Sequence, residues 1–284
     1  MSFVIWTSDC ETDSVRLTKH HGLANDFLVV LDEVNGRAVE VNGELARRLC
    51  DRHTGIGADG LIRGELGEGP GAGDADVVMH LFNSDGSRAE MSGNGIRCLA
   101  HAVALARDQH EAALRIQTDA GVRRVALRRD APDRAEVSVS MGPARPGPVI
   151  PTPVDEELDD RHLTVDLGNP HLVIETEAPD AVDLVTRGAW LEQQFPDGIN
   201  VEFVAKDDGR ADAIVLRVWE RGAGVTSACG TGACAAAHVA HEWGLVGDVV
   251  SVEMPGGRAE VRLGADIVLV GPAELIATLE VTDE

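Results

Sequence analysis

The 284-residue sequence contains no tyrosine, and aromatic residues make up only 3% of it. Valine, leucine, isoleucine and alanine must therefore build the core, and the hydrophobic share of 44% suffices for one large domain or two ordinary ones. No apolar run approaches the roughly 20 residues that cross a membrane. The stretch before Val15 has no basic segment ahead of its apolar residues, so it does not read as a signal peptide.

Lysine is almost absent, since Lys19 and Lys206 are the only two, and the formal net charge is −23. A field of this sign repels nucleic acid and anionic membranes, so we expect neither as a partner. An acidic surface without lysine is typical of proteins in concentrated salt, because the Debye length at about 1 M salt is only roughly 3 Å. The composition predicts a halophilic, cytoplasmic protein; an acidic chain in an ordinary cell is the alternative.

The five cysteines are odd in number, irregularly spaced and contain no CxxC pair, which argues against a zinc knuckle or a dithiol redox motif. His238 and His241 lie three residues apart without a metal-binding carboxylate signature, so we predict no metal site. Residues 55–60 form a literal GxGxxG. The segment before it is helical in pattern, whereas a dinucleotide fingerprint follows a strand, so no nucleotide cofactor is predicted.

One stretch, residues 226–243, organises the rest: it reads TSACGTGACAAAHVAHEW. Cys229 stands before a glycine-rich turn that opens a run of small, helix-favouring residues, so the thiol is expected at a helix N-terminus. Unpaired N–H groups and the helix dipole favour an anion there. They are also expected to lower the thiol pKa below its free value of about 8.5.

The same arrangement occurs 137 positions upstream, where Ser92-Gly93-Asn94-Gly95 corresponds to Cys229-Gly230-Thr231-Gly232. A turn, a helix and a trailing strand that recur at a near-constant offset indicate two homologous halves. Two such halves would bring two helix N-termini to one cleft between them. The remaining pattern is many short strands with one long helix per half, which predicts an α+β fold. We place the N-terminal half at residues 15–117 plus 272–284, the C-terminal half at 118–271, and an extension at 1–14.

Several segments resemble the diaminopimelate epimerase family, over roughly residues 15–280. They are, in order, HGLANDF, GIGADG, FNSDGSRAEMSGNGIRC, LGNPH, FPDGINV, WERGAGVTSACGTGAC, PGG and VGPA. The resemblance implies two pseudo-symmetric halves, each a mainly antiparallel β-sheet or barrel around a central helix, with the active site between them. It implies an isomerase that interconverts LL- and meso-diaminopimelate in lysine biosynthesis without pyridoxal phosphate or another cofactor. The implied partner is this small molecule; a homodimer is left open.

The resemblance also assigns roles to residues. Cys229 matches one of two catalytic acid–base groups, and Ser92 stands at the position of the other. His171 and Glu220 match positions that tune the catalytic thiols. The two helix N-termini are expected to hold the α-carboxylate, at Gly93-Asn94 and Gly230-Thr231. The resemblance assigns substrate binding to Asn25, Asn83, Gly93, Asn94, Asn169, Asn200, Glu220, Arg221, Gly230 and Thr231.

Ser92 departs from the family, which has cysteine before GNG, and an alcohol is a far weaker acid than a thiol. Three interpretations follow. The chain is a Cys-to-Ser form, engineered or natural, that holds substrate and epimerises poorly. Alternatively, it is a natural variant in which Cys229 works with Ser92 on a related task, such as one-sided proton exchange or water elimination from a hydroxylated amino acid, or it is a paralogue without catalysis that binds a ligand or partner. A proline-racemase-like enzyme is the competing enzymatic reading. A smaller departure is Ala24, where the family has glycine.

Overall fold

The computed structural model describes residues 14–67 and 73–282. The extension expected at 1–14 therefore lies outside the described residues, apart from Ser14, which begins the first strand. Up to residue 142 the elements are β1 (Ser14–Gly22), β2 (Asn25–Leu31), α1 (Asp32–Asn35), α2 (Gly43–Cys50), β3 (Gly60–Leu66), β4 (Val77–Asn83), β5 (Arg88–Ala89), α3 (Gly93–Ala106), β6 (Glu111–Thr118), β7 (Gly121–Ala131) and β8 (Arg134–Gly142).

The chain continues with a second series of the same kind. Its elements are β9 (Arg145–Pro146), α4 (Thr152–Glu157), β10 (His162–Asp166), β11 (Pro170–Glu175), a 3₁₀ turn (Pro179–Ala181), α5 (Leu184–Gln194), β12 (Asn200–Lys206), β13 (Ala213–Glu220), β14 (Gly224–Val225), α6 (Gly230–Glu242), β15 (Val249–Met254), β16 (Gly257–Arg262) and β17 (Ile267–Thr282).

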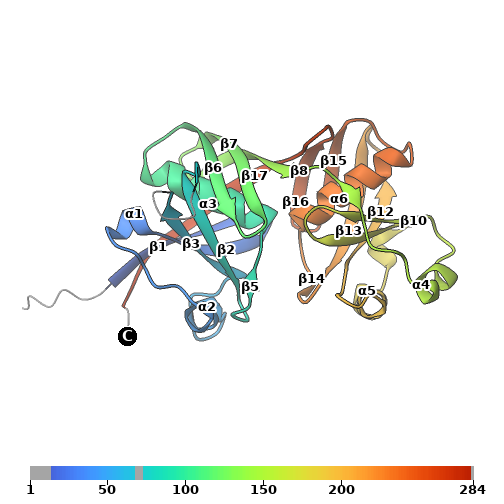
Figure 1. Cartoon of the computed structure of the whole chain (residues 1–284). Coiled ribbons are helices and arrows are strands. Elements are labelled where there is room, and N and C mark those ends of the chain that lie inside the picture. The colour runs from blue at the N-terminus through green and yellow to red at the C-terminus, as the bar shows by residue number, and fades with distance from the viewer. Residues whose placement is uncertain (1–13, 68–72, 283–284) are drawn as a thin grey trace, which may run out of the picture.

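The strands form two lobes, each wrapped around one helix (Figure 1). In the first lobe, β1, β2, β3, β4, β6, β7, β8 and β17 close into a barrel around α3. In the second, β10, β11, β12, β13, β15 and β16 surround α6 and join β17 at one edge and β9 at the other. β8 and β17 pair with each other and run from one lobe into the other.

The two lobes share one topology. β2 pairs in parallel with β3 and β4 with β6, and β11 pairs in parallel with β12 and β13 with β15. The short β5 pairs with β4 as β14 pairs with β13. The predicted α+β fold of two pseudo-symmetric halves, each a mainly antiparallel sheet around a central helix, is confirmed. The division at residues 117 and 272 stays a prediction; α3 contacts β6, β7, β8 and β17, on both sides of it.

The central helices are almost wholly buried because their residues are small and apolar. In α6 every residue from Gly230 to Ala237 is buried, and the alanines let the surrounding strands approach closely. Cys98 in α3 and Cys234 in α6 are both 0% exposed and belong to the core cluster that surrounds the helices. No helix in the described part of the chain is long and apolar enough to span a membrane.

The lobes also touch through a tight hairpin between β1 and β2. Its two central residues, Leu23 and Ala24, have φ values of 58° and 63°, as a two-residue hairpin turn requires. A side chain at Ala24 is strained in this conformation, which explains why glycine suits the position. A Cβ on Gly256 would lie 2.0 Å from the Leu23 carbonyl oxygen, so only glycine permits this contact between lobes.

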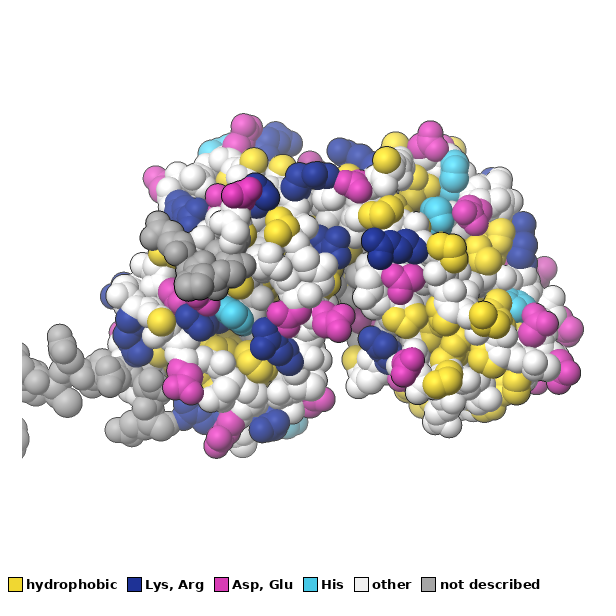
Figure 2. Space-filling view, in the orientation of Figure 1, with side chains coloured by type: hydrophobic (Ala, Val, Ile, Leu, Met, Phe, Trp, Pro, Cys, Tyr) yellow, Lys and Arg dark blue, Asp and Glu magenta, His cyan; other side chains and the backbone are white. Residues whose placement is uncertain are grey.

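On the face drawn in Figure 2, acidic side chains are interspersed with basic ones. Because the net charge is −23, self-repulsion opposes the compact state at low ionic strength. We expect the melting temperature to rise by several degrees between about 0.1 M and about 2 M KCl, since the Debye length shrinks from about 10 Å to a few ångströms. Differential scanning calorimetry measures this, with sucrose as an uncharged control. A melting temperature that stays level or falls in KCl would contradict the halophilic reading.

Candidate active site

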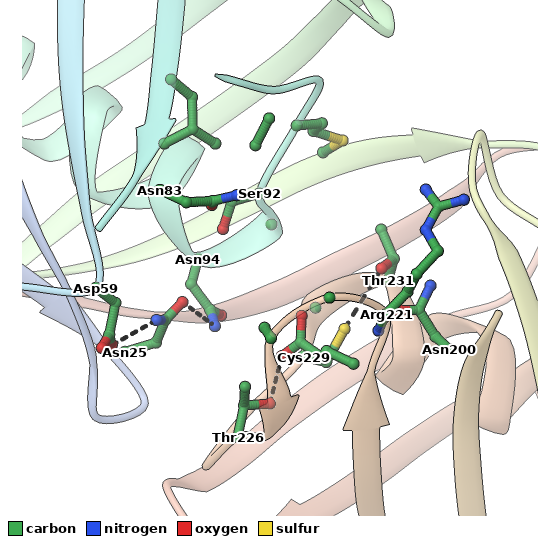
Figure 3. Close-up of a pocket in the computed structure, with 18 of the residues that line it drawn as sticks. Asn25, Asp59, Asn83, Ser92, Asn94, Asn200, Arg221, Thr226, Cys229 and Thr231 are labelled. Carbon is green, nitrogen blue, oxygen red and sulfur yellow. Dashed lines mark hydrogen bonds between the residues drawn. The ribbon is translucent and has the colours of Figure 1, made fainter. Parts of the chain in front are cut away.

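A cavity of about 850 Å³ lies between the lobes, and both central helices begin at its wall (Figure 3). Ser92 is the N-cap of α3 and Cys229 is the N-cap of α6. The helix starts abut: a Cβ on Gly93 would lie 3.1 Å from the Gly230 Cα, so a larger residue would crowd this crossing. The convergence of two helix N-termini on one pocket, expected from the repeat, is therefore present.

Each N-cap satisfies two N–H groups and leaves two free. The Gly95 N–H donates to the Ser92 Oγ over 3.0 Å, and the Gly232 N–H donates to the Cys229 Sγ over 3.3 Å. Ile96 and Ala233 donate to the N-cap carbonyls. Among the described residues, no hydrogen bond joins the backbone N–H groups of Gly93, Asn94, Gly230 and Thr231 to an acceptor. Four free donors and two helix dipoles thus favour an anion at this point of the pocket.

The predicted site residues gather at this cavity with one exception. Its lining includes Asn25, Asn83, Ser92, Gly93, Asn94, Asn169, Asn200, Glu220, Arg221, Cys229, Gly230 and Thr231. His171 lies behind the wall and is 0% exposed. These residues come from both lobes, so the pocket exists only where the lobes meet.

Cys229 is surrounded by acid–base groups. The Glu220 carboxyl group lies close enough to influence the thiol electrostatically, and it accepts a hydrogen bond from the Thr226 hydroxyl. The Thr231 hydroxyl lies 3.5 Å from the Sγ atom. Glu220 lines the cavity, so a proton on the sulfur has a route to the pocket through this carboxylate.

The pKa of the Cys229 thiol is raised well above its usual value, and the expectation of a lowered pKa is wrong. The largest cause is burial, since Cys229 is only 5% exposed; the carboxylates of Glu220 and Glu202 add to it. The hydrogen bonds from Thr231 and Gly232 act in the opposite direction but are weaker. Burial also raises the pKa of the Glu220 carboxyl. In the resting protein Cys229 is therefore a neutral thiol, with the Glu220 carboxyl group beside it.

A buried chain of hydrogen bonds supports Cys229 from behind. Glu202 Oε1 lies 2.7 Å from His171 Nδ1, and His171 Nε2 lies 3.0 Å from Asn169 Oδ1. Asn169 Nδ2 donates to Thr231 Oγ1 over 3.3 Å. Because the Asn169 oxygen must accept, His171 carries a proton on Nε2, and a second proton, on Nδ1 or on the Glu202 carboxyl group, must lie between Nδ1 and Glu202 Oε1. The Thr231 hydroxyl, having accepted from Asn169, is left to donate towards the Cys229 sulfur.

Comparison with known proteins places these residues in a family. The family model described as diaminopimelate epimerase matches residues 17–146 and 163–276. The chain is 41% identical over 278 residues to diaminopimelate epimerase of Synechococcus elongatus, covering 92% of this chain and 95% of that protein. It is 37% identical over 281 residues to diaminopimelate epimerase of Halothermothrix orenii, at 93% and 96% coverage.

The chain belongs to the diaminopimelate epimerase family. Two solved structures have the same fold at low sequence identity. One is a hydroxyproline epimerase from Agrobacterium vitis, with a TM-score of 0.68, 16% identity, and coverage of 95% of this chain and 93% of that one. The other is a phenazine biosynthesis protein from Bacillus anthracis, with a TM-score of 0.69, 14% identity, and coverage of 94% and 99%. These likenesses concern the fold alone.

Arg221 and Asn200 occupy the outer wall of the pocket in this family member. Asn200 Nδ2 donates to the Pro170 oxygen over 2.9 Å, and Asn200 Oδ1 accepts from the Arg221 N–H over 3.0 Å. The Asn200 amide therefore fixes the backbone at Arg221. The Arg221 guanidinium donates to the Asp197 carbonyl and has no carboxylate within 4.0 Å among the residues described. It remains an exposed cation beside the cavity.

A buried arginine stands behind the start of α3. Arg97 is 0% exposed, and its Nη2 donates to Asn94 Oδ1 over 2.8 Å. Its Nε donates to the Pro272 carbonyl, and its Nη1 has no hydrogen-bond partner. Because arginine only donates, it turns the Asn94 amide so that Nδ2 reaches Asn25 Oδ1 at 3.0 Å and the Ala228 carbonyl at 2.9 Å. This amide ties the two lobes together next to Cys229.

Four residues of this network were missed by the sequence reasoning: Asp59, Arg97, Glu202 and Thr226. Glu202 had a usable signal, because it is a carboxylate inside the otherwise apolar run of β12, whose first five residues are all buried. Arg97 likewise interrupts the apolar residues of α3. Asp59 accepts from Asn25 over 2.7 Å and lies within the GIGADG segment. For Thr226 we find no signal in the sequence.

Proposed function

We propose that this chain interconverts LL- and meso-diaminopimelate by proton transfer at Cα, without pyridoxal phosphate, in the cytoplasm. The main support for this proposal is the set of four free N–H donors at two abutting helix N-termini, with Cys229 on one side and Ser92 on the other. Loss of an α-proton spreads negative charge onto the adjacent carboxylate. Donors aimed at that carboxylate stabilise the carbanion as it forms.

Each side of the substrate carbon would face one N-cap residue. Cys229 removes or returns the proton on its own face, with Glu220 accepting the thiol proton to generate the thiolate. Ser92 serves the opposite face as a proton donor of low acidity, so inversion is slower than with two thiols. Arg221 suits the distal carboxylate, since a guanidinium binds carboxylates through paired hydrogen bonds. The asparagine side chains hold the pocket walls, because most of their polar atoms are bound within the protein.

The test is a stereochemical assay of the purified chain with LL-diaminopimelate, in about 2 M KCl, followed by chiral chromatography. We expect the meso form to accumulate towards equilibrium, and hydroxylamine, which traps pyridoxal phosphate, to leave the rate unchanged. L-Proline and trans-4-hydroxy-L-proline serve as competing substrates. Inversion of either imino acid, with none of diaminopimelate, would overturn the proposal in favour of the proline-racemase-like reading.

Arg97 provides a second, more local prediction. Arg97→Met removes a buried cation that no carboxylate neutralises among the described residues, and it frees the Asn94 amide to rotate. We expect KM for diaminopimelate to rise about tenfold, equivalent to about 1.4 kcal/mol of lost binding, with a smaller change in kcat.

The matched control for Arg97 is Arg129→Met. The Arg129 side chain is 17% exposed, donates to the Pro132 carbonyl and lies away from the cavity. Steady-state kinetics of both variants, alongside their melting temperatures, separates binding from stability. Equal KM values for the Arg97 variant and the parent would show that the buried cation only supports packing.

A further inference from the structure

The two lobes match in topology but differ in the chemistry they bring to the pocket. The register of β2 with β3 joins Phe27 to Gly60, and the register of β11 with β12 joins His171 to Asn200. When the two lobes are aligned on these pairs and on the ends of β4 and β13, each acid–base residue of the second lobe corresponds to a residue of the first lobe that is neither a carboxylate, an imidazole nor a thiol. The equivalent pairs are Cys229 and Ser92, Glu220 and Asn83, His171 and Phe27, and Glu202 and Ile62.

The first-lobe position equivalent to Glu220 carries an amide, Asn83, in place of a carboxylate. The Ser92 Oγ accepts from the Gly95 N–H, and the Asn83 amide donates to Ser87 Oγ over 3.0 Å. Three carboxylates of the first lobe, Asp59, Asp85 and Glu90, also line the cavity, and none of them is hydrogen-bonded to Ser92 in the described structure. Asp85 accepts from Ser87, and Asp59 accepts from Asn25, Asp26 and Arg52. In the described structure, no carboxylate or imidazole is hydrogen-bonded to Ser92.

The Cys229 face, in contrast, has a complete proton route. Glu220, the carboxylate that acts on the thiol, lines the same cavity of about 850 Å³ as Cys229, and solvent can fill this cavity. A proton taken from a substrate by the sulfur can therefore be replaced by a solvent proton before it returns. Figure 3 shows Cys229 and Thr226 on one side of this cavity and Ser92 with Asn83 on the other.

We propose, on the basis of the function proposed above, a further activity: exchange of the substrate α-hydrogen with solvent, with retention of configuration, on the Cys229 face alone. The Cys229 thiolate takes the α-proton as the C–H bond breaks, and the electron pair moves onto the carboxylate. The sulfur then exchanges its proton through Glu220, and the same thiol returns a solvent proton to the same face. No oxidant or second reactant is needed.

Retention competes with inversion at the carbanion. Return from the Cys229 thiol is fast because a thiol is much the stronger acid, while delivery from the Ser92 hydroxyl is slow. One epimer therefore exchanges many times per inversion. The other epimer, whose α-hydrogen faces Ser92, exchanges only by inverting, so its unreacted fraction stays unlabelled.

The experiment incubates LL- and meso-diaminopimelate separately with the enzyme in D₂O and stops each reaction at low conversion. Mass spectrometry of the separated epimers gives deuterium in the residual substrate, and the same samples give the rate of inversion. We expect one epimer to gain deuterium at least about tenfold faster than it inverts, and the other to gain none beyond inversion.

The outcomes separate the two proposals. Inversion with equal labelling of both residual epimers, or with labelling no faster than inversion, overturns the one-face inference and leaves the epimerase function standing. Absence of both labelling and inversion overturns the epimerase function itself. Two variants sharpen the result: Ser92→Ala should keep the one-face labelling while inversion falls further, and Ser92→Cys should bring labelling and inversion to within about threefold of each other. If Ser92→Ala folds poorly, Ser92→Thr, which retains a capping hydroxyl, should keep the tenfold excess.

Discussion

Replacing Ser92 with cysteine is expected to raise kcat for inversion of diaminopimelate about a hundredfold or more. General acid–base catalysis by a well-matched group contributes about 10²–10⁴ in rate, and a hydroxyl forfeits most of this because it neither gives up nor takes a proton readily. The new thiol would stand at the N-terminus of α3, where the Gly95 N–H donates to the side chain. The substitution changes one atom at a site that already faces the pocket.

The measurement is steady-state inversion in both directions, because an epimerase must obey one equilibrium constant. Ser92→Thr is the matched control, since it retains a hydroxyl at the N-cap and should leave kcat within a few-fold of the parent. If Ser92→Cys binds substrate normally and is no faster, the hydroxyl is not what limits inversion. The reading of this chain as a Cys-to-Ser form with impaired epimerisation would then be wrong.

Cys229→Ala is expected to lower kcat by about a thousandfold or more, because the pocket loses the thiol on which Glu220 acts. KM should change little, since the four backbone donors remain. Loss of the N-cap is expected to cost about 1 kcal/mol of stability, which a thermal melt would show separately.

Cys234→Ala is the control for that variant. Cys234 lies in the same helix, five residues further on, is 0% exposed and does not line the cavity. Burial raises its pKa to about 12, so it is a neutral core residue. A Cys229→Ala enzyme with activity close to that of Cys234→Ala would exclude Cys229 as an acid–base group.

The fold and most of the pocket could be predicted because the sequence patterns that indicate them are either local or repeated in both halves. Glycine-rich turns 137 positions apart identified both helix starts, and short alternating segments identified the strands. The barrel closure depends on β8 and β17 pairing across about 130 residues, and no local pattern contains that pairing. It follows instead from the need to bury both central helices.

The electrostatics of Cys229 could not be predicted in the same way. A helix N-terminus lowers the pKa of a thiol that is partly exposed. The sequence shows that Cys229 stands at a helix N-terminus, but it does not show how deeply the thiol is buried. The depth comes from strands β12 and β13, which bring Glu202 and Glu220 against the start of α6. A Cβ on Gly232 would lie 2.7 Å from Glu202 Oε1, a proximity set entirely by tertiary packing.

The most direct test of the account is a crystal structure of the Cys229→Ala variant with meso-diaminopimelate bound. We expect one carboxylate at about 3 Å from the N–H groups of Gly93, Asn94, Gly230 and Thr231. We also expect the adjacent Cα to lie between residue 229 and the Ser92 Oγ. A ligand whose carboxylates both lie away from the two helix starts would contradict the account.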